Sequence, residues 1–303
     1  MSPELEAWKI KGKYISYGPL NHQIFVKELG NTQASAQKTL LLLHGFPESS
    51  YSYHAVVEGL LKTFDRIILF DMLGYGLSDK PEKNYSYSLL EQADTAFTVW
   101  KHFGINGGHL LAHDMGVSVA TEILFRHEIN LLPASFSEGL QSITFTNGSM
   151  VLEMAELRIT QKILLSKYGK LMSKVNNYSL FKQQVISANG NKNLNEKEIQ
   201  ILWEASTLKD GNKKVYQTIK YLNDRKQFEK TRWLPALGQT KLQIHLCWGE
   251  DDAVAKVAMA HYLKKEVCTN ATLTIMKDLG HFCQLDNPKK WVEYVSEFYK
   301  KMK

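Results

Sequence analysis

A single aspartate separates an apolar run from a helix-like segment in LLAHDMGVS (Leu110–Ser118), with Ala112 and Gly116 two positions before and after Asp114. This pattern predicts a nucleophile elbow, a sharp strand-to-helix turn that pushes the central side chain clear of the backbone. The positive N-terminus of the following helix would stabilise an anion there. The spacing therefore predicts Asp114 as a nucleophile, and a simple helix N-cap is the alternative that this motif alone leaves open.

Two later loops carry side chains that could assist such a nucleophile. Asp252 lies three residues after Gly249 in CWGEDDAV, where an apolar run ends, and Glu250 and Asp251 are its rivals. His281 follows the last apolar run, in KDLGHFCQLDNP. The chain order nucleophile, acid, histidine is that of a triad in which the acid orients a histidine base.

A fourth loop, HGFPESSY (His44–Tyr51), follows a buried apolar run. The residue after His-Gly is Phe46, and the residue after the nucleophile is Met115. We predict that their backbone N–H groups point at an oxyanion, because loops placed like these supply such donors. A plain strand-ending turn is the alternative for Gly45 and Pro47 by themselves.

These loops need strands and helices to position them. Three short runs near the start are interpreted as a strand meander: Trp8–Ile10, Tyr14–Tyr17 and Gln23–Val26. Later strands are expected at Thr39–Gly45, Arg66–Asp71, His109–His113, Ser142–Asn147, Leu242–Gly249 and Ala271–Met276. Helices are expected at Ala55–Thr63, Ser88–Phe103, Gly116–His127 and from Pro288 onwards. This alternation predicts an α/β fold with a mostly parallel central sheet flanked by helices.

The alternation is interrupted at about Gly148 by polar segments of helical periodicity, and strand character returns at LQIHLCWG. We therefore expect one core formed by residues 1–147 and 238–303, with residues 148–237 inserted as a helical lid. A lid inserted there would cover the carboxyl ends of the strands, where open α/β sheets bind ligands.

The bulk properties of the 303 residues favour an ordinary globular protein, with 44% hydrophobic and 22% charged residues. Net charge is +6, but the lysines are spread along the sequence, so we expect no nucleic-acid partner. The cysteines Cys247, Cys268 and Cys283 lack metal-ligand spacing, and no acidic or cysteine cluster accompanies His109 and His113. We expect no metal, no cofactor, no membrane-spanning segment and a cytoplasmic location. A homodimer is left open.

Together the motifs resemble the epoxide hydrolase and haloalkane dehalogenase branch of the α/β-hydrolases, and within it the mesoderm-specific transcript protein-like hydrolases. The resemblance covers nearly the whole chain through HGFPES, D-x-x-G-x-G-x-S-D-K-P, HD-x-G, GH-x-x-Q-x-D-x-P and KYLNDRKQF-x-x-x-W. It implies an α/β-hydrolase fold and a covalent mechanism. The Asp114 carboxylate would attack an electrophilic carbon to give an ester, and His281, held by Asp252, would activate the water that hydrolyses it.

Departures from that branch narrow the expected substrate. Dehalogenases of the branch commonly hold the halide with side-chain donors, whereas Phe46 and Met115 stand at those positions here. Tyr221 matches a lid tyrosine that protonates the opening oxygen in epoxide hydrolases, although it could equally pack the lid onto the core. Tyr168 and Tyr178 are candidates for a second lid tyrosine only because they lie in the segment expected to form the lid. We therefore expect an epoxide-hydrolase-like enzyme acting on a hydrophobic small molecule.

Two other functions stay open from the sequence. One is another hydrolase with an aspartate nucleophile, either a dehalogenase or an esterase-like variant. The other is a vestigial, non-enzymatic binding protein on the same fold. The acid of the triad also has substitutes, because Asn147 or Asp251 would take its place if Asp252 faced solvent.

Overall fold

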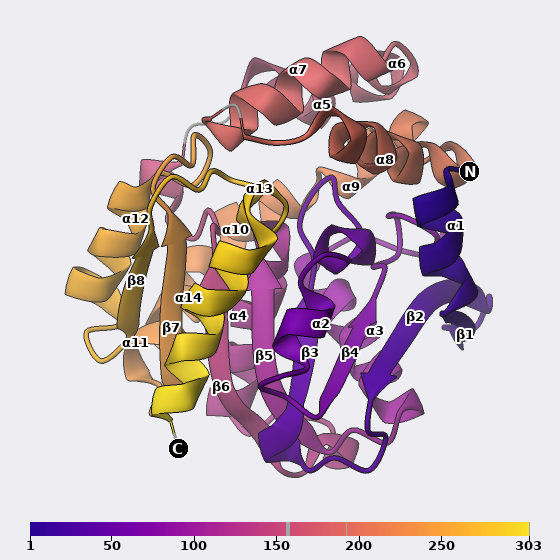
Figure 1. Ribbon diagram of the computed structural model, residues 1–303. Helices are drawn as coiled ribbons and strands as arrows, with labels where there is room; N and C mark the ends of the chain where they lie inside the picture. Colours follow the sequence, from indigo (N-terminus) through magenta and orange to yellow (C-terminus); the bar gives the residue numbers. More distant parts are fainter. Residues whose placement is uncertain (156–157, 192, 303) are drawn as a thin grey trace.

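The computed structural model describes residues 1–155, 158–191 and 193–302, and it contains an eight-stranded sheet between two layers of helices (Figure 1). The strand order is β1-β2-β4-β3-β5-β6-β7-β8. The β1–β2 and β2–β4 pairs are antiparallel, and the other pairs are parallel. The strands are β1 Lys13–Tyr17, β2 His22–Gly30, β3 Thr39–Leu43, β4 Arg66–Phe70, β5 Gly107–His113, β6 Gly139–Thr146, β7 Gln243–Gly249 and β8 Thr272–Met276.

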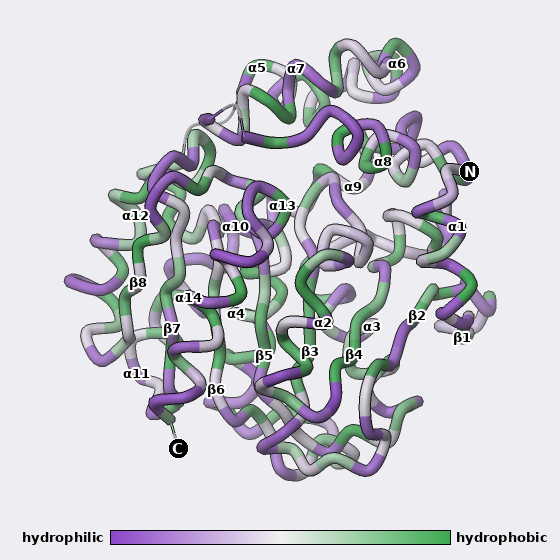
Figure 2. The backbone as a smooth tube through the Cα atoms, in the orientation of Figure 1, coloured by the Kyte–Doolittle hydropathy of each residue, from purple (hydrophilic) through white to green (hydrophobic). Residues whose placement is uncertain are grey.

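The central strands are buried on both faces, as the continuous apolar runs predicted. Every residue of β3, β4 and β5 is buried, and the tube of β5 is largely green in Figure 2. Side chains alternate between the two faces: Leu41 and Leu43 join one hydrophobic cluster, whereas Leu40 and Leu42 join the other. The predicted α/β fold with a mostly parallel sheet is therefore confirmed.

Helices cover both faces of the sheet. The first cluster includes buried residues of α3, α4 and α12, and the second includes those of α1, α2 and α14. The α2 helix is only four residues long, much shorter than the predicted Ala55–Thr63. The bounds of these helices are α1 Pro3–Ile10, α2 Val57–Leu60, α3 Leu89–His102, α4 Met115–Glu128, α12 Val257–Tyr262, α13 Cys283–Asp286 and α14 Pro288–Lys301.

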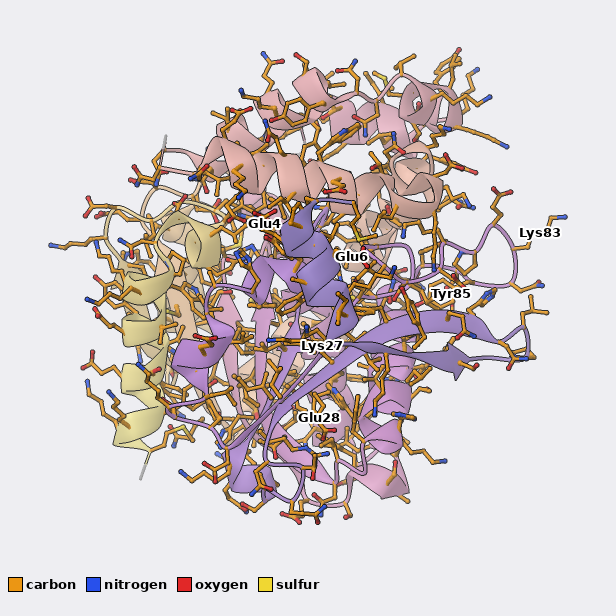
Figure 3. The ribbon with its side chains drawn as sticks, turned by 45° about the vertical axis from the view of Figure 1, so that its right-hand side comes forward. Glu4, Glu6, Lys27, Glu28, Lys83 and Tyr85 are labelled. Carbon is orange, nitrogen blue, oxygen red and sulfur yellow. The ribbon has the colours of Figure 1, made fainter. Side chains whose placement is uncertain are left out.

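The N-terminal segment corrects one prediction, because Pro3–Ile10 is a helix and Trp8–Ile10 is not a strand. The Ser2 side chain accepts a hydrogen bond from the Leu5 N–H and caps this helix. Leu5 and Trp8 lie three residues apart and are both buried. Figure 3 shows α1 in front of β2, where the Lys27 ammonium donates to the Trp8 carbonyl over 2.7 Å.

The helices between β6 and β7 are α5 Ile159–Leu165, α6 Gly169–Lys174, α7 Tyr178–Asn189, α8 Glu196–Thr207, α9 Val215–Thr218, α10 Tyr221–Phe228 and α11 Leu234–Gln239. Helices α5 to α8 lie above one edge of the sheet (Figure 1). Phe181 of α7 clusters with Phe282 of the core, while Trp233 near α11 donates to Glu122 of α4. The boundaries 148–237 for a lid stay a prediction. No described helix is long and apolar enough to cross a bilayer.

Candidate active site

Asp114 occupies a strained turn between β5 and α4, with φ 46° and ψ −113°. A non-glycine residue in such a conformation costs about 1–3 kcal/mol, which packing elsewhere must offset. Glycines permit the close approach: a Cβ on Gly45 would lie 2.7 Å from the Asp114 Cβ, and one on Gly116 would lie 2.6 Å from the His44 carbonyl oxygen. The Phe46 N–H donates to Asp114 Oδ2 over 2.9 Å.

Asp252 faces the interior and contacts His281. The His281 Nδ1 lies 2.9 Å from Asp252 Oδ2, and both side chains are buried. The same carboxylate accepts three further hydrogen bonds, from the Asn147 side chain and from the backbone N–H groups of Val254 and Ala255. Asn147 thus serves as a donor to this acid and is not its substitute. Such a carboxylate fixes both the tautomer and the direction of the imidazole ring.

The other imidazole nitrogen of His281 points at Asp114. Its Nε2 lies 3.8 Å from Asp114 Oδ1, which is longer than a hydrogen bond. Burial lowers the pKa of His281, but the charge and hydrogen bond of Asp252, with the charges of Asp114 and Glu48, raise it to about 9. The free site therefore holds an imidazolium between two carboxylates at neutral pH. The three predicted triad residues lie together in the structure.

Two other histidines of these loops lie beside the site. The buried His44 lies 2.8 Å from the Gly45 carbonyl oxygen through Nδ1 and accepts the Met72 N–H through Nε2. Burial lowers the pKa of His113 well below its ordinary value, so that this ring is neutral. Within the described residues, no group of three or more His, Cys, Asp or Glu side chains is placed to hold a metal ion.

Comparisons with known proteins identify the family of this chain. A family model described as the alpha/beta hydrolase fold matches residues 38–288.

The chain belongs to the α/β-hydrolase family.

Among similar proteins, the mesoderm-specific transcript homolog protein of Bos taurus is 31% identical over 294 residues, which cover 95% of this hydrolase and 85% of the relative. LipZ of Mycobacterium tuberculosis, named as a candidate hydrolase, is 34% identical over 296 residues, or 96% of each chain. The resemblance to the mesoderm-specific transcript-like hydrolases is thus confirmed.

Solved structures share the fold of this hydrolase at low sequence identity. The epoxide hydrolase CorEH superposes with a TM-score of 0.72 at 16% identity, covering 96% of this chain and 98% of its own. A loop variant of the haloalkane dehalogenase DbeA from Bradyrhizobium elkanii superposes with a TM-score of 0.74 at 19% identity. The match covers 96% of this chain and 97% of the dehalogenase. These likenesses bear on the fold alone.

A largely apolar pocket of the hydrolase opens onto Asp114 and His281, which both line it. Most of its wall comes from the segment between β6 and β7, including Leu152, Leu164, Met172, Leu180, Phe181 and Val185. Tyr221 of α10 also lines the pocket, is 3% exposed, and has its ring centroid 5.8 Å from that of Phe46. Tyr221 and Asp114 therefore line the same pocket.

The two other tyrosines suggested by region do not reach this pocket. Tyr168 is 59% exposed, and the Tyr178 hydroxyl donates to Glu196 at the protein surface. The suggestion of either as a second lid tyrosine is wrong because their helices turn them outwards. Among the described residues, only the Phe46 N–H donates to the Asp114 carboxylate; Met115 begins α4, where helical N–H groups lack partners within the helix.

Two residues at the site escaped the sequence analysis. Glu48 of the HGFPES motif is buried, accepts from the Gly45 N–H and from Gln284, and lies 3.6 Å from His113 Nε2. Burial raises its pKa to about 8, and the charge of His281 opposes that rise. Arg225 lines the pocket one helical turn after Tyr221. The four-residue spacing in KYLNDRKQF was a signal for Arg225, since it places both on one helix face.

Proposed function

We propose that this hydrolase opens an epoxide ring on a hydrophobic small molecule through a covalent ester on Asp114. The observation that carries the proposal is the type of residue at the elbow: an aspartate, facing the His281–Asp252 pair at 3.8 Å. A carboxylate is suited to displacement at a saturated carbon. The apolar wall of the pocket favours a substrate with a hydrophobic body.

In the first step, an oxygen of Asp114 attacks a ring carbon, and the carbon–oxygen bond of the epoxide breaks. The electron pair stays on the departing oxygen, which takes a proton from the Tyr221 hydroxyl. An alkyl ester of Asp114 results. The imidazolium form of His281 suits this step, because a protonated ring is not a nucleophile. The Asp114 carboxylate is then the group that attacks the ring carbon.

In the second step, His281 removes a proton from water, and the oxygen of that water attacks the carbonyl carbon of the ester. Esterification removes the negative charge of Asp114, which is one cause of the raised pKa of His281. The pKa therefore falls once the ester forms, and the histidine becomes available as a base. The Phe46 N–H, and the Met115 N–H at the start of α4, would stabilise the oxyanion on Asp114.

The lid between β6 and β7, predicted at residues 148–237, would supply the apolar wall and thus the substrate preference. The core would supply the triad. This division of labour is part of the proposal.

The test is incubation with aryl epoxides and alkyl halides in heavy-oxygen water, followed by mass spectrometry of the peptide that contains Asp114. We expect label in Asp114 after several turnovers with epoxides, and none in heavy-oxygen water without substrate. His281→Gln should accumulate the ester, so that this peptide gains the mass of one epoxide molecule. Turnover without label, or no turnover with either class, would contradict the proposal, and labelling with halides alone would favour a dehalogenase.

A further inference from the structure

Arg225 of α10 carries a buried charge that forms no ion pair within the described residues, and this charge opposes the burial that raises the pKa of Glu229 at the end of the same helix. The side chain is 5% exposed and lines the pocket together with Asp114 and Tyr221. Its Nε donates to Ser118 Oγ over 2.9 Å, but its buried Nη2 has no acceptor among the described residues. None of the carboxylates in the described part of the chain forms an ion pair with it. Buried charges are ordinarily paired, so this guanidinium is set up to receive an anion.

The position of Arg225 is fixed on both sides. Ser118, which holds its Nε, lies one helical turn after Asp114 at the start of α4. Tyr221 lies one turn before Arg225 on α10, and its ring centroid is 4.9 Å from the guanidinium carbon. The guanidinium is therefore held between the nucleophile helix and the tyrosine that faces the same pocket.

We propose that Arg225 binds the oxygen that leaves the carbon attacked by Asp114, acting beside Tyr221 as the second donor. This inference rests on the proposed epoxide opening. As the carbon–oxygen bond breaks, the electron pair goes to the oxygen, the Tyr221 proton moves onto it, and an Arg225 N–H donates a hydrogen bond. The positive charge of Arg225 then stabilises the tyrosinate until that group regains a proton from water.

Two further observations support this role. Among the described residues, Tyr221 is the only tyrosine that lines the pocket, so a second phenol is not at hand. Burial raises the pKa of Tyr221, and the charge of Arg225 opposes that rise. An arginine is charged at all working pH values and is fixed before the reaction, as a donor to a developing oxyanion should be.

The direct test measures ester formation on Asp114 in the His281→Gln background, by rapid quenching and mass spectrometry with styrene oxide. Adding Arg225→Met should slow ester formation by about 10²–10³-fold, the usual effect of losing one donor to an oxyanion. Arg225→Lys should retain part of the rate. Added ethylguanidinium should raise the rate of ester formation at least tenfold in Arg225→Ala. It should not change this rate in Tyr221→Phe. An unchanged rate in Arg225→Met would overturn the inference.

Thermal unfolding separates this role from a structural one. Removing a buried charge that lacks an ionic partner should leave the melting temperature of Arg225→Met equal to or above that of the parent. A structural arginine would give the reverse, a lower melting temperature with an unchanged rate for the folded fraction, and would overturn the inference.

A binding measurement does not depend on ester formation. Calorimetry on Asp114→Asn should show phenylacetate binding at least tenfold more tightly than the neutral phenylacetamide, and Arg225→Met added to that variant should abolish the preference. Equal binding of the two ligands would overturn the anion site even where esters form. If the anion preference holds but no epoxide ever modifies Asp114, the proposed epoxide opening is wrong. The anion site of Arg225 would then stand, but its assignment to a leaving oxygen would be wrong as well.

Discussion

The two sides of the pocket differ in how fully their polar groups are satisfied. On the core side, Asp252 accepts four hydrogen bonds and His281 lies between it and Asp114. On the α10 side, Arg225 has an unpartnered nitrogen in a largely apolar wall. The contrast teaches that the acid which orients His281 is satisfied without a ligand, whereas Arg225 has a nitrogen left over for the substrate oxygen that we propose it binds.

The core side is also the strained side. Asp114 has a positive φ at the elbow, and Gly45 and Gly116 let the end of β3 pack closely against this turn. Strain held by a rigid frame keeps the carboxylate exposed to the pocket, which reduces the reorganisation needed in the reaction. Mutations on the core side should therefore stop the chemistry, and mutations on the α10 side should change the rate of the first step.

The largest effect is expected on the core side, from Asp252→Asn. An amide cannot hold the imidazole in the required tautomer or stabilise its charge, and loss of the orienting acid in a triad costs about 10⁴-fold. Ester hydrolysis, followed by stopped-flow after a single alkylation, should slow on this scale. Asp251→Asn is the matched control, because Asp251 is exposed and its carboxylate accepts a hydrogen bond from Asn191, away from His281. Equal losses in the two variants would contradict the assignment of Asp252.

A smaller effect is expected across the pocket, from Tyr221→Phe. Loss of the proton donor should slow ester formation by about 10²-fold and leave ester hydrolysis unchanged, since general acid catalysis contributes on that scale. Rapid-quench measurement of the two steps checks this split. The control is Tyr178→Phe, whose hydroxyl bonds to Glu196 outside the pocket. If Tyr221→Phe slowed only hydrolysis, the two sides would not divide the reaction as proposed.

The smallest effect is a change in titration. Removing the charge of Asp114 with Asp114→Asn should lower the pKa of His281 from about 9, which NMR of the imidazole can follow. Because the folded pKa lies above the ordinary 6.5, the ionised ring stabilises the fold below about pH 6.5, and this stabilisation is lost as the pH rises through about 9. In Asp114→Asn the loss should be smaller and complete at lower pH in denaturant titrations. An unchanged pKa would mean that the two side chains are not coupled.

Local patterns were sufficient for much of the fold. The alternating apolar runs gave β3 to β8 and helices α3, α4 and α14 to within a few residues, because each depends on its own periodicity. The pattern failed at the N-terminus, where Trp8–Ile10 belongs to α1. The cap by Ser2 and the spacing of Leu5 and Trp8 decide that helix, and a three-residue window contains neither.

Amino-acid order by itself determined that Asp114, Asp252 and His281 follow strand ends, and the carboxyl ends of parallel strands meet at one edge of a sheet. Only the tertiary structure decided between neighbours such as Asp251 and Asp252, of which one is exposed and the other is buried against His281. It alone also revealed that Arg225 is buried, with a guanidinium nitrogen that has no hydrogen-bond partner among the described residues. The physical reason is that spacing fixes the face on which a side chain lies, whereas burial, charge pairing and pKa depend on segments distant in the chain.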